Sequence, residues 1–330
     1  MTTNDAIGIV VIGRNEGERL RSCLESVGGQ VRAAVYVDSG STDGSVELAS
    51  DHGWEVVELD PATPFTAGRA RNEGFEHLIA GDPGIAAVQF LDGDCELIEG
   101  WIPTAAQALC ANPDTAVVAG VLKERYPEAS VYNRLCGIEW DQPTGETLEV
   151  GGVFVARSDA FKEVGGFNPV LIAGEEPELC YRLRGAGWKI RRLSDAMAWH
   201  DSAMYRFGQW WKRSVRHGHT CAEGVLLHGQ ESERYKVRQL VSNFALGLGL
   251  PLVALGGARF SRGKSLVLLA LPVVIFGRAT KIIADRDVDQ RDAAIYAAFL
   301  VLGKVPNALG QLRCFALTLT GREKRIIEYK

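Results

Sequence analysis

Two aspartates directly follow an apolar segment that has the composition and length of a buried strand. The segment is residues 87–91, and Asp92 and Asp94 stand on either side of Gly93 immediately after it. Two carboxylates at this spacing can share one divalent cation and leave its other positions to phosphate oxygens. An Asp-x-Asp tripeptide is also common in loops, where the acids merely solvate a turn. The remaining motifs of the chain therefore decide between a cation site and a polar turn.

Short apolar segments alternate with amphipathic helical patterns through the first hundred residues. The segments with strand composition are residues 7–12, 33–37, 55–59 and 87–91. Strands that alternate with helices at this spacing predict βαβ units and a mostly parallel sheet flanked by helices, so the expected fold class is α/β. In such a sheet the carboxyl ends of the strands bind ligands, and Asp38 and Asp92 stand at two of these ends.

Charge is divided unevenly along the 330 residues. Residues 1–202 contain 16 Lys and Arg against 32 Asp and Glu, a net of −16, whereas residues 203–330 contain 20 against 9, a net of +11, and the two sum to −5. A basic segment attached to an acidic domain indicates an anionic partner surface, either lipid headgroups or nucleic acid. Nucleic acid is the less expected partner, because the acidic half would repel a phosphate backbone. Seven scattered cysteines without a C-x-x-C pair suit a reducing compartment.

Several motifs in a consistent order resemble the family 2 glycosyltransferases of the GT-A fold, over roughly residues 7–220. The motifs are VVIGRNE, VDSGSTDGS, RARNEG, FLDGDCE, GGVFVARSDAFKEVGGF, GEEPELCYRLRGAGW and the histidine at position 200. The resemblance implies an enzyme that moves a sugar from a nucleotide diphosphate sugar to an acceptor hydroxyl. The family more often has T-x-Y-N-E where this chain has Gly13-Arg14, and D-D-G-S where it has Asp38-Ser39. Both positions lie near the expected base and ribose contacts, so UDP and GDP both stay open as the nucleotide.

The resemblance also implies roles for individual residues around the donor. Asp94 is the implied direct ligand of Mn²⁺ or Mg²⁺, Asp92 binds the ribose or the metal, and His200 contacts the metal or diphosphate. An imidazole slightly favours Mn²⁺, although a lone histidine is often structural. Asn15, Glu16 and Asp38 are expected to meet the nucleoside. Arg71 is expected on the diphosphate side, with Arg69 as its rival. Gly152, together with Gly151, is expected beside the donor sugar.

Glu176 is the candidate catalytic base. Glu175 and Glu176 stand where the family usually has an E-D pair. A carboxylate at a helix N-terminus is stabilised as an anion, so we expect a depressed pKa and a weak base that accepts its proton late. The alternative is that these acids, together with Glu178, are ordinary first-turn residues that accompany Pro177. A base that deprotonates the acceptor inverts the anomeric configuration, as the family implies, whereas direct attack by Glu176 on the sugar would retain it.

Three apolar segments occupy the C-terminal region, at about residues 240–258, 265–284 and 293–318. None contains the ~20 uninterrupted apolar residues of a clear spanning helix, yet all three are too apolar for a linker. The basic residues between the first two segments mark a cytoplasmic loop. We therefore expect either a hairpin that spans the membrane with the second and third segments or helices that lie in the interface. The alternative is a soluble helical subdomain that packs on the sheet or in a dimer.

We therefore predict a GT-A domain over residues 1–220 and an α-helical, apolar and basic region over 221–330 that associates with a membrane. The predicted enzyme glycosylates a glycan or polyprenyl-linked acceptor in surface polysaccharide synthesis, at the cytoplasmic face of the inner (plasma) membrane, and an oligomer is possible. The alternative is a non-catalytic nucleotide-sugar-binding or assembly protein of the same fold. A sugar nucleotidyltransferase is less expected, because GRNEGERLRSC is a poor version of the glycine-rich basic loop that such an enzyme needs.

Overall fold

The computed structural model describes residues 6–322, which form two compact units. The α/β unit contains the chain up to Tyr126 together with Glu139–Leu171 and Glu175–Ser202. The helical unit contains Pro127–Ile138, Ile172–Gly174 and the chain from Ala203 onward. We expected the division at residue 220, but that position lies inside one continuous helix, α8 (Phe207–His228), which packs against α13 (Lys304–Thr320). The continuous C-terminal part of the helical unit therefore starts at Ala203.

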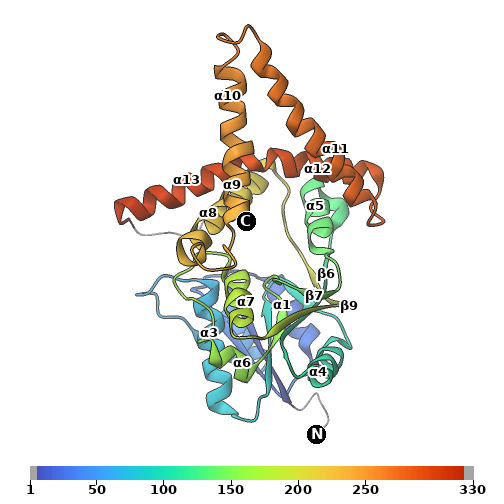
Figure 1. Cartoon of the computed structure of the whole chain (residues 1–330). Helices are drawn as coiled ribbons and strands as arrows, with labels where there is room; N and C mark the ends of the chain where they lie inside the picture. The colour runs from blue at the N-terminus through green and yellow to red at the C-terminus, as the bar shows by residue number, and fades with distance from the viewer. Residues whose placement is uncertain (1–5, 323–330) are drawn as a thin grey trace. The chain divides into compact units, whose positions relative to one another are not determined.

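A nine-stranded sheet forms the centre of the α/β unit, in the order β3-β2-β1-β4-β8-β6-β9-β5 with β7 paired to β9 (Figure 1). The strands are β1 (Ile7–Gly13), β2 (Ala33–Asp38), β3 (Glu55–Glu58), β4 (Ala87–Asp92), β5 (Cys95–Leu97), β6 (Thr115–Glu124), β7 (Gly145–Thr147), β8 (Phe154–Arg157) and β9 (Lys189–His200). The first four strands in this order pair in parallel, whereas β8 is antiparallel to β4 and β6, and β5 and β7 are antiparallel to β9. The α/β fold is confirmed. The parallel pairing that we expected holds in β3-β2-β1-β4, and the sheet as a whole is mixed.

Helices flank this sheet, as the alternating pattern predicted (Figure 1). They are α1 (Glu18–Val27), α2 (Ser45–Asp51), α3 (Ala67–Gly81), α4 (Trp101–Ala111), α6 (Ser158–Glu163) and α7 (Glu175–Gly185). The apolar stripe of α1, Leu20, Cys23, Leu24 and Val27, is buried, as expected for a helix that packs one face on a sheet. Strand β1 is buried along nearly its whole length, which explains its unbroken apolar sequence.

The helical unit contains closely packed helices. Its elements are α5 (Val131–Trp140, which ends in the α/β unit), α8, α9 (Val237–Phe244), α10 (Leu250–Gly256), α11 (Ala270–Ala284), α12 (Gln290–Leu302) and α13, with a 3₁₀ turn η2 (Pro127–Ala129), a π-helical turn η3 (Ala245–Gly249) between α9 and α10, and a 3₁₀ segment η4 (Lys264–Leu269) before α11. Helices α8 and α13 cross at two glycines. A Cβ atom on Gly218 would lie 2.0 Å from the backbone oxygen of Asn307, and one on Gly310 would lie 2.0 Å from that of Val215. Only glycine permits so close a crossing.

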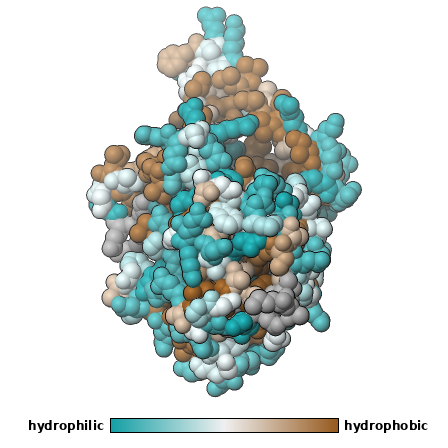
Figure 2. Space-filling view, turned by 60° about the horizontal axis from the view of Figure 1, so that its bottom comes forward, coloured by the Kyte–Doolittle hydropathy of each residue, from teal (hydrophilic) through white to brown (hydrophobic). Residues whose placement is uncertain are grey.

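Three helices of this unit are long and apolar enough to cross a membrane: Val237–Gly256, Lys264–Ala284 and Gln290–Thr320. Val237–Gly256 meets this length and composition as well, although we expected only the second and third apolar segments to span a membrane. Only 17% and 6% of the first two windows are buried within the structure, so most of their apolar side chains are not covered by protein. Figure 2 shows apolar residues gathered at the upper end of the view, where the α10–α11 hairpin lies, below a tip that carries hydrophilic residues. These helices therefore have the surface of a membrane-associated region.

Candidate active site

Three parallel strands end side by side at one edge of the sheet. In the register of these strands, Gly13 of β1 lies opposite Asp38 of β2, and Ile12 of β1 lies opposite Asp92 of β4. The two aspartates therefore flank the end of β1, at the edge where open α/β sheets bind ligands.

The Asp38 carboxylate shapes the turn that follows β2. It is buried and accepts hydrogen bonds from the Tyr36 hydroxyl at 2.9 Å, from the Gly40 N–H at 2.8 Å and from the Ser41 N–H at 2.7 Å. Burial raises the pKa of the Tyr36 phenol, and the neighbouring Asp38 charge raises that pKa further, so the phenol remains a neutral donor. The sequence pointed to Asp38, but it did not show that Tyr36 would hold this carboxylate in place.

Asn15 ties the loop after β1 to the loop after β2. Its backbone is left-handed with φ 56°, a conformation that asparagine tolerates better than most residues. The Asn15 N–H donates to Ser41 Oγ at 2.9 Å, and its Oδ1 accepts the Thr42 N–H at 2.7 Å. Glu16 pairs with Arg19 at 2.8 Å. The rim on which a nucleoside is expected is thus already organised by contacts between the two loops.

Arg71 joins three carboxylates in the interior of the α/β unit. Its side chain is 2% exposed, and its guanidinium lies 2.8 Å from Asp92 Oδ1, 2.8 Å from Glu175 Oε1 and 3.1 Å from Glu176 Oε1. The rival Arg69 forms instead an i,i+4 ion pair with an acid of its own helix, α3. Arg71 is therefore the arginine that the fold brings to the end of β4, and Glu175 is its partner as well as Glu176.

Gly152 packs closely against Arg71, Asp92 and Glu176. A Cβ atom on Gly152 would lie 2.8 Å from Arg71 Nη2, 3.0 Å from Asp92 Oδ2 and 3.1 Å from Glu176 Oε1. A Cβ atom on Gly151 would have no other atom within 4 Å. The two neighbouring glycines thus differ, and only Gly152 is needed for the close approach of the charged groups.

The Glu176 carboxyl has a raised pKa. Burial raises the pKa from its ordinary value of 4.5 to about 7, Glu175 adds to the rise, and Arg71 opposes it. Our expectation of a depressed pKa was wrong. Glu176 does stand in the first turn of α7, but a helix terminus contributes only about 0.3–1 kcal/mol, less than one pKa unit, and desolvation outweighs it. A carboxylate with a pKa near 7 is a stronger base than an ordinary glutamate.

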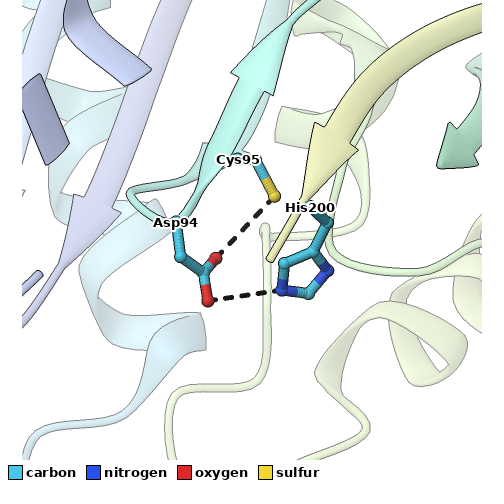
Figure 3. A group of neighbouring side chains, drawn as sticks. All are labelled: Asp94, Cys95 and His200. Atoms are coloured by element: carbon cyan, nitrogen blue, oxygen red, sulfur yellow. Dashed lines mark hydrogen bonds and ion pairs between the residues drawn. The ribbon is translucent and has the colours of Figure 1, made fainter. Parts of the chain in front are cut away.

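A second group forms on the other side of Gly93. Strand β5 pairs antiparallel with the end of β9, so Cys95 lies directly opposite His200. His200 Nε2 lies 3.3 Å from Asp94 Oδ2, and Cys95 Sγ lies 3.8 Å from Asp94 Oδ1. Figure 3 shows the three side chains converging. The His200 ring stacks on Trp140, with ring centroids 4.6 Å apart and planes 11° from parallel, which orients the imidazole.

These three side chains fit a divalent cation. Their donor atoms all lie within 4.8 Å of one another, and carboxylate, imidazole and thiolate are all established ligands of divalent transition metals. Asp92, which we expected beside Asp94, is held by Arg71 instead. The turn between the two aspartates is fixed by the Gly93 N–H, which donates to the Ile12 carbonyl at 2.8 Å. The two carboxylates of the Asp-x-Asp motif therefore belong to adjacent but different groups.

Sequence reasoning missed Cys95 and Trp140. Cys95 had a signal, since it directly follows Asp94, but its side chain joins the site only through the pairing of β5 with β9. Trp140 lies outside every motif in the sequence, so no local pattern pointed to it.

Residues 8–165 match the family model for glycosyl transferase family 2. This domain belongs to glycosyltransferase family 2. The resemblance read from the motifs is thereby confirmed, and the glycosyltransferase domain includes the ends of β1, β2 and β4 together with Arg71 and both aspartates of the Asp-x-Asp motif.

Named relatives agree with this family. Pre-mycofactocin glycosyltransferase of Mycobacterium tuberculosis is 26% identical over 288 residues, which cover 78% of this chain and 57% of that protein. The chain thus spans little more than half the length of this relative. Succinoglycan biosynthesis protein ExoA of Rhizobium meliloti is 28% identical over 188 residues, which cover 52% of this chain and 54% of ExoA.

A solved structure has the same fold as the glycosyltransferase domain and its helical continuation. Mannosyltransferase PcManGT from Pyrobaculum calidifontis, determined in complex with GDP-Man and Mn²⁺, aligns with a TM-score of 0.58 and 17% sequence identity. The alignment covers 89% of this chain and 86% of PcManGT. At this level of identity the likeness shows the GT-A fold.

Proposed function

We propose that this protein is a metal-dependent, inverting glycosyltransferase that moves a sugar from a nucleotide diphosphate sugar to a hydroxyl of a glycan or polyprenyl-linked acceptor. The observation that carries the proposal is the contact of the buried Arg71 with the partly exposed Asp92 and Glu176 against Gly152, at the ligand-binding edge of a family 2 domain. ExoA takes its name from succinoglycan biosynthesis, which supports a role in surface polysaccharide synthesis.

Glu176 serves as the base. It accepts the proton of the acceptor hydroxyl while that oxygen bonds to the anomeric carbon of the donor sugar. The bond from this carbon to the diphosphate breaks on the opposite face, its electron pair leaves with the nucleoside diphosphate, and the configuration inverts. A pKa of about 7 suits a group that must be ionised before the reaction and protonated after it.

The diphosphate of the donor lies at the group formed by Asp94, Cys95 and His200. Asp94 and His200 would hold the cation, with Asp92 directed to the ribose or the metal, and a bound divalent cation neutralises charge on a leaving diphosphate. Mn²⁺ is favoured over Mg²⁺, because imidazole suits Mn²⁺ better and because PcManGT was solved with Mn²⁺.

The nucleoside of a UDP- or GDP-sugar binds at the rim made by the loops after β1 and β2. Asn15 ties the two loops together, Asp38 shapes the loop after β2, and Glu16 stands beside them. Gly152 lets the charged groups lie against the backbone next to the expected place of the donor sugar, and Arg71 keeps Asp92 in position.

The test is Mn²⁺-dependent turnover of a panel of UDP- and GDP-sugars by the wild type and by Glu176→Gln. We expect the variant to lose about 10²–10⁴-fold in turnover while it still binds donor, because the amide keeps the shape but cannot accept a proton. Glu76→Gln, an exposed position on α3, is the matched control and should retain turnover. Donor binding without turnover by the wild type for every sugar would instead support a non-catalytic nucleotide-sugar-binding protein.

We also propose that the helical unit associates with the cytoplasmic face of the membrane through the α10–α11 hairpin. Val253 and Val267 are exposed on its two legs, and the tip carries exposed Arg259, Phe260 and Arg262. Apolar legs and a basic tip suit a surface of anionic lipids.

The membrane proposal is tested by flotation of the full chain with anionic vesicles. Val267→Asp, at a side chain that is 72% exposed, should weaken vesicle binding by about 2–3 kcal/mol, because a charge must then enter the apolar phase. Val170→Asp, at a 70% exposed position in the α/β unit, is the matched control and should bind as the wild type does. Equal loss of binding in both variants would contradict a specific role of the hairpin.

A further inference from the structure

The group formed by Asp94, Cys95 and His200 contains a sulfur donor that a carboxylate-only metal site would lack. Cys95 is fully buried, and it is the direct cross-strand neighbour of His200 in the pairing of β5 with β9. Its Sγ therefore lies on the same side of the sheet as the imidazole, and it also contacts Asp94 at 3.8 Å. The thiol is thus placed by strand register and not by a flexible loop.

The spacing of the donor atoms matches that of ligands on one ion. With bonds of about 2.0–2.2 Å to nitrogen and oxygen and about 2.3 Å to sulfur, tetrahedral ligands lie roughly 3.4 Å apart for an N/O pair and roughly 3.6 Å apart for an S/O pair. The observed distances are 3.3 Å for His200 Nε2 to Asp94 Oδ2 and 3.8 Å for Cys95 Sγ to Asp94 Oδ1. The two distances involve different oxygens of Asp94, and the donor atoms of the three residues all lie within 4.8 Å of one another, so a small closure of the group would bring one atom of each residue onto a single ion.

A sulfur ligand changes which metals the site prefers. Mg²⁺ takes oxygen ligands, whereas Zn²⁺ and Co²⁺ bind thiolate and imidazole more tightly than Mn²⁺ does. The thiol binds as thiolate, so binding of the cation releases the thiol proton to solvent.

We infer that Asp94, Cys95 and His200 form a mixed oxygen, sulfur and nitrogen site that binds Zn²⁺ and Co²⁺ in preference to Mn²⁺ and Mg²⁺. The inference rests on the proposed function only in taking this site as the metal site of the donor complex. Its consequence is that Zn²⁺ competes with Mn²⁺ at the active site, and that Cys95 determines the outcome of this competition.

The test uses the metal-depleted full chain with Co²⁺ as the probe. Binding of Co²⁺ should produce a thiolate-to-cobalt charge-transfer band in the near ultraviolet, and Zn²⁺ should abolish it by displacement. The band should vanish in Cys95→Ser and persist in Cys110→Ser, which removes an exposed cysteine outside the site. The affinity for Zn²⁺ relative to Mn²⁺ should fall at least about tenfold in Cys95→Ser, since even loss of a contact that merely supports a ligand costs 10–100-fold.

The wild-type spectrum is decisive whether or not the buried serine variant folds. Co²⁺ that binds without the band, an absence of Co²⁺ binding, or a band that survives in folded Cys95→Ser would each overturn the inference. Mn²⁺-dependent donor turnover by the wild type is scored separately. Turnover without the band would contradict the sulfur ligand but support the proposed glycosyltransferase activity. The band without turnover would support the metal site but contradict the proposed function.

Discussion

Two groups of charged and polar side chains lie on either side of Gly93, and they differ in how their negative charge can be compensated. The Arg71 group consists of Arg71, Asp92, Glu175 and Glu176, and the Asp94 group consists of Asp94, Cys95 and His200. In the Arg71 group a buried guanidinium of the protein binds all three carboxylates. The Asp94 group offers oxygen, sulfur and nitrogen donors suited to an external cation. Adjacent acids of one Asp-x-Asp motif can therefore have separate tasks.

The charge of the Arg71 group explains why its members depend on one another. One positive and three negative side chains leave an excess of negative charge when all are ionised, and a proton on Glu176 reduces it. The raised pKa of Glu176 is the consequence of this crowding and of burial. The raised pKa supports the role as base that we propose for Glu176.

Replacement of Arg71 should give the largest effect on stability. Arg71→Met leaves the buried Glu175 and the partly exposed Asp92 and Glu176 without their cation, so we expect a loss of about 3–5 kcal/mol in the free energy of unfolding, measured by urea denaturation. Arg69→Met, two residues away on the same helix, breaks an ion pair at a partly exposed position and two hydrogen bonds to carbonyls, and should cost about 1–2 kcal/mol. Equal losses in the two variants would show that Arg71 does not hold the group together.

A methyl group added at Gly152 or at Gly151 tests how tightly the Arg71 group is packed. Gly152→Ala places a Cβ atom within 3.1 Å of Arg71, Asp92 and Glu176, and should cost about 1–3 kcal/mol of stability together with donor turnover. Gly151→Ala meets open space and should leave both nearly unchanged. Thermal unfolding and turnover of the pair check this prediction, and a harmless Gly152→Ala would mean that the group has room to spare.

The third expected effect is a pH dependence of stability that arises in the Arg71 group. Folded Glu176 keeps its proton up to about pH 7, whereas the unfolded carboxyl releases it near 4.5. The folded state therefore binds more protons between these values, and the contribution of Glu176 to stability falls as pH rises through that window. Glu176→Gln should remove this component, so its stability relative to the wild type should improve from pH 5 to pH 8 in urea denaturation. A constant difference over that range would contradict the raised pKa.

Activity should follow the opposite trend, because only ionised Glu176 accepts a proton. The kcat/KM of the wild type should rise with pH up to about 7 and then level off.

The amino-acid sequence by itself determined the α/β fold, the strand ends and the positions of the site acids along the chain. Residues 7–12 and 87–91 are short, largely apolar runs that end in turn residues, and such runs become central strands for local reasons of pattern and burial. The motifs around Asp38, Asp92 and Glu176 likewise indicated the family from local sequence alone.

Tertiary structure alone decided which groups these residues join. Arg71 meets Glu175 across 104 positions of sequence, and Asp94 meets His200 across 106. Strand pairing of β5 with β9 brought Cys95 opposite His200, and helix packing buried Glu176 and reversed the pKa shift that its helix position predicted. Desolvation and contacts between distant residues depend on how whole elements pack, and a local pattern of residue types contains no information about either.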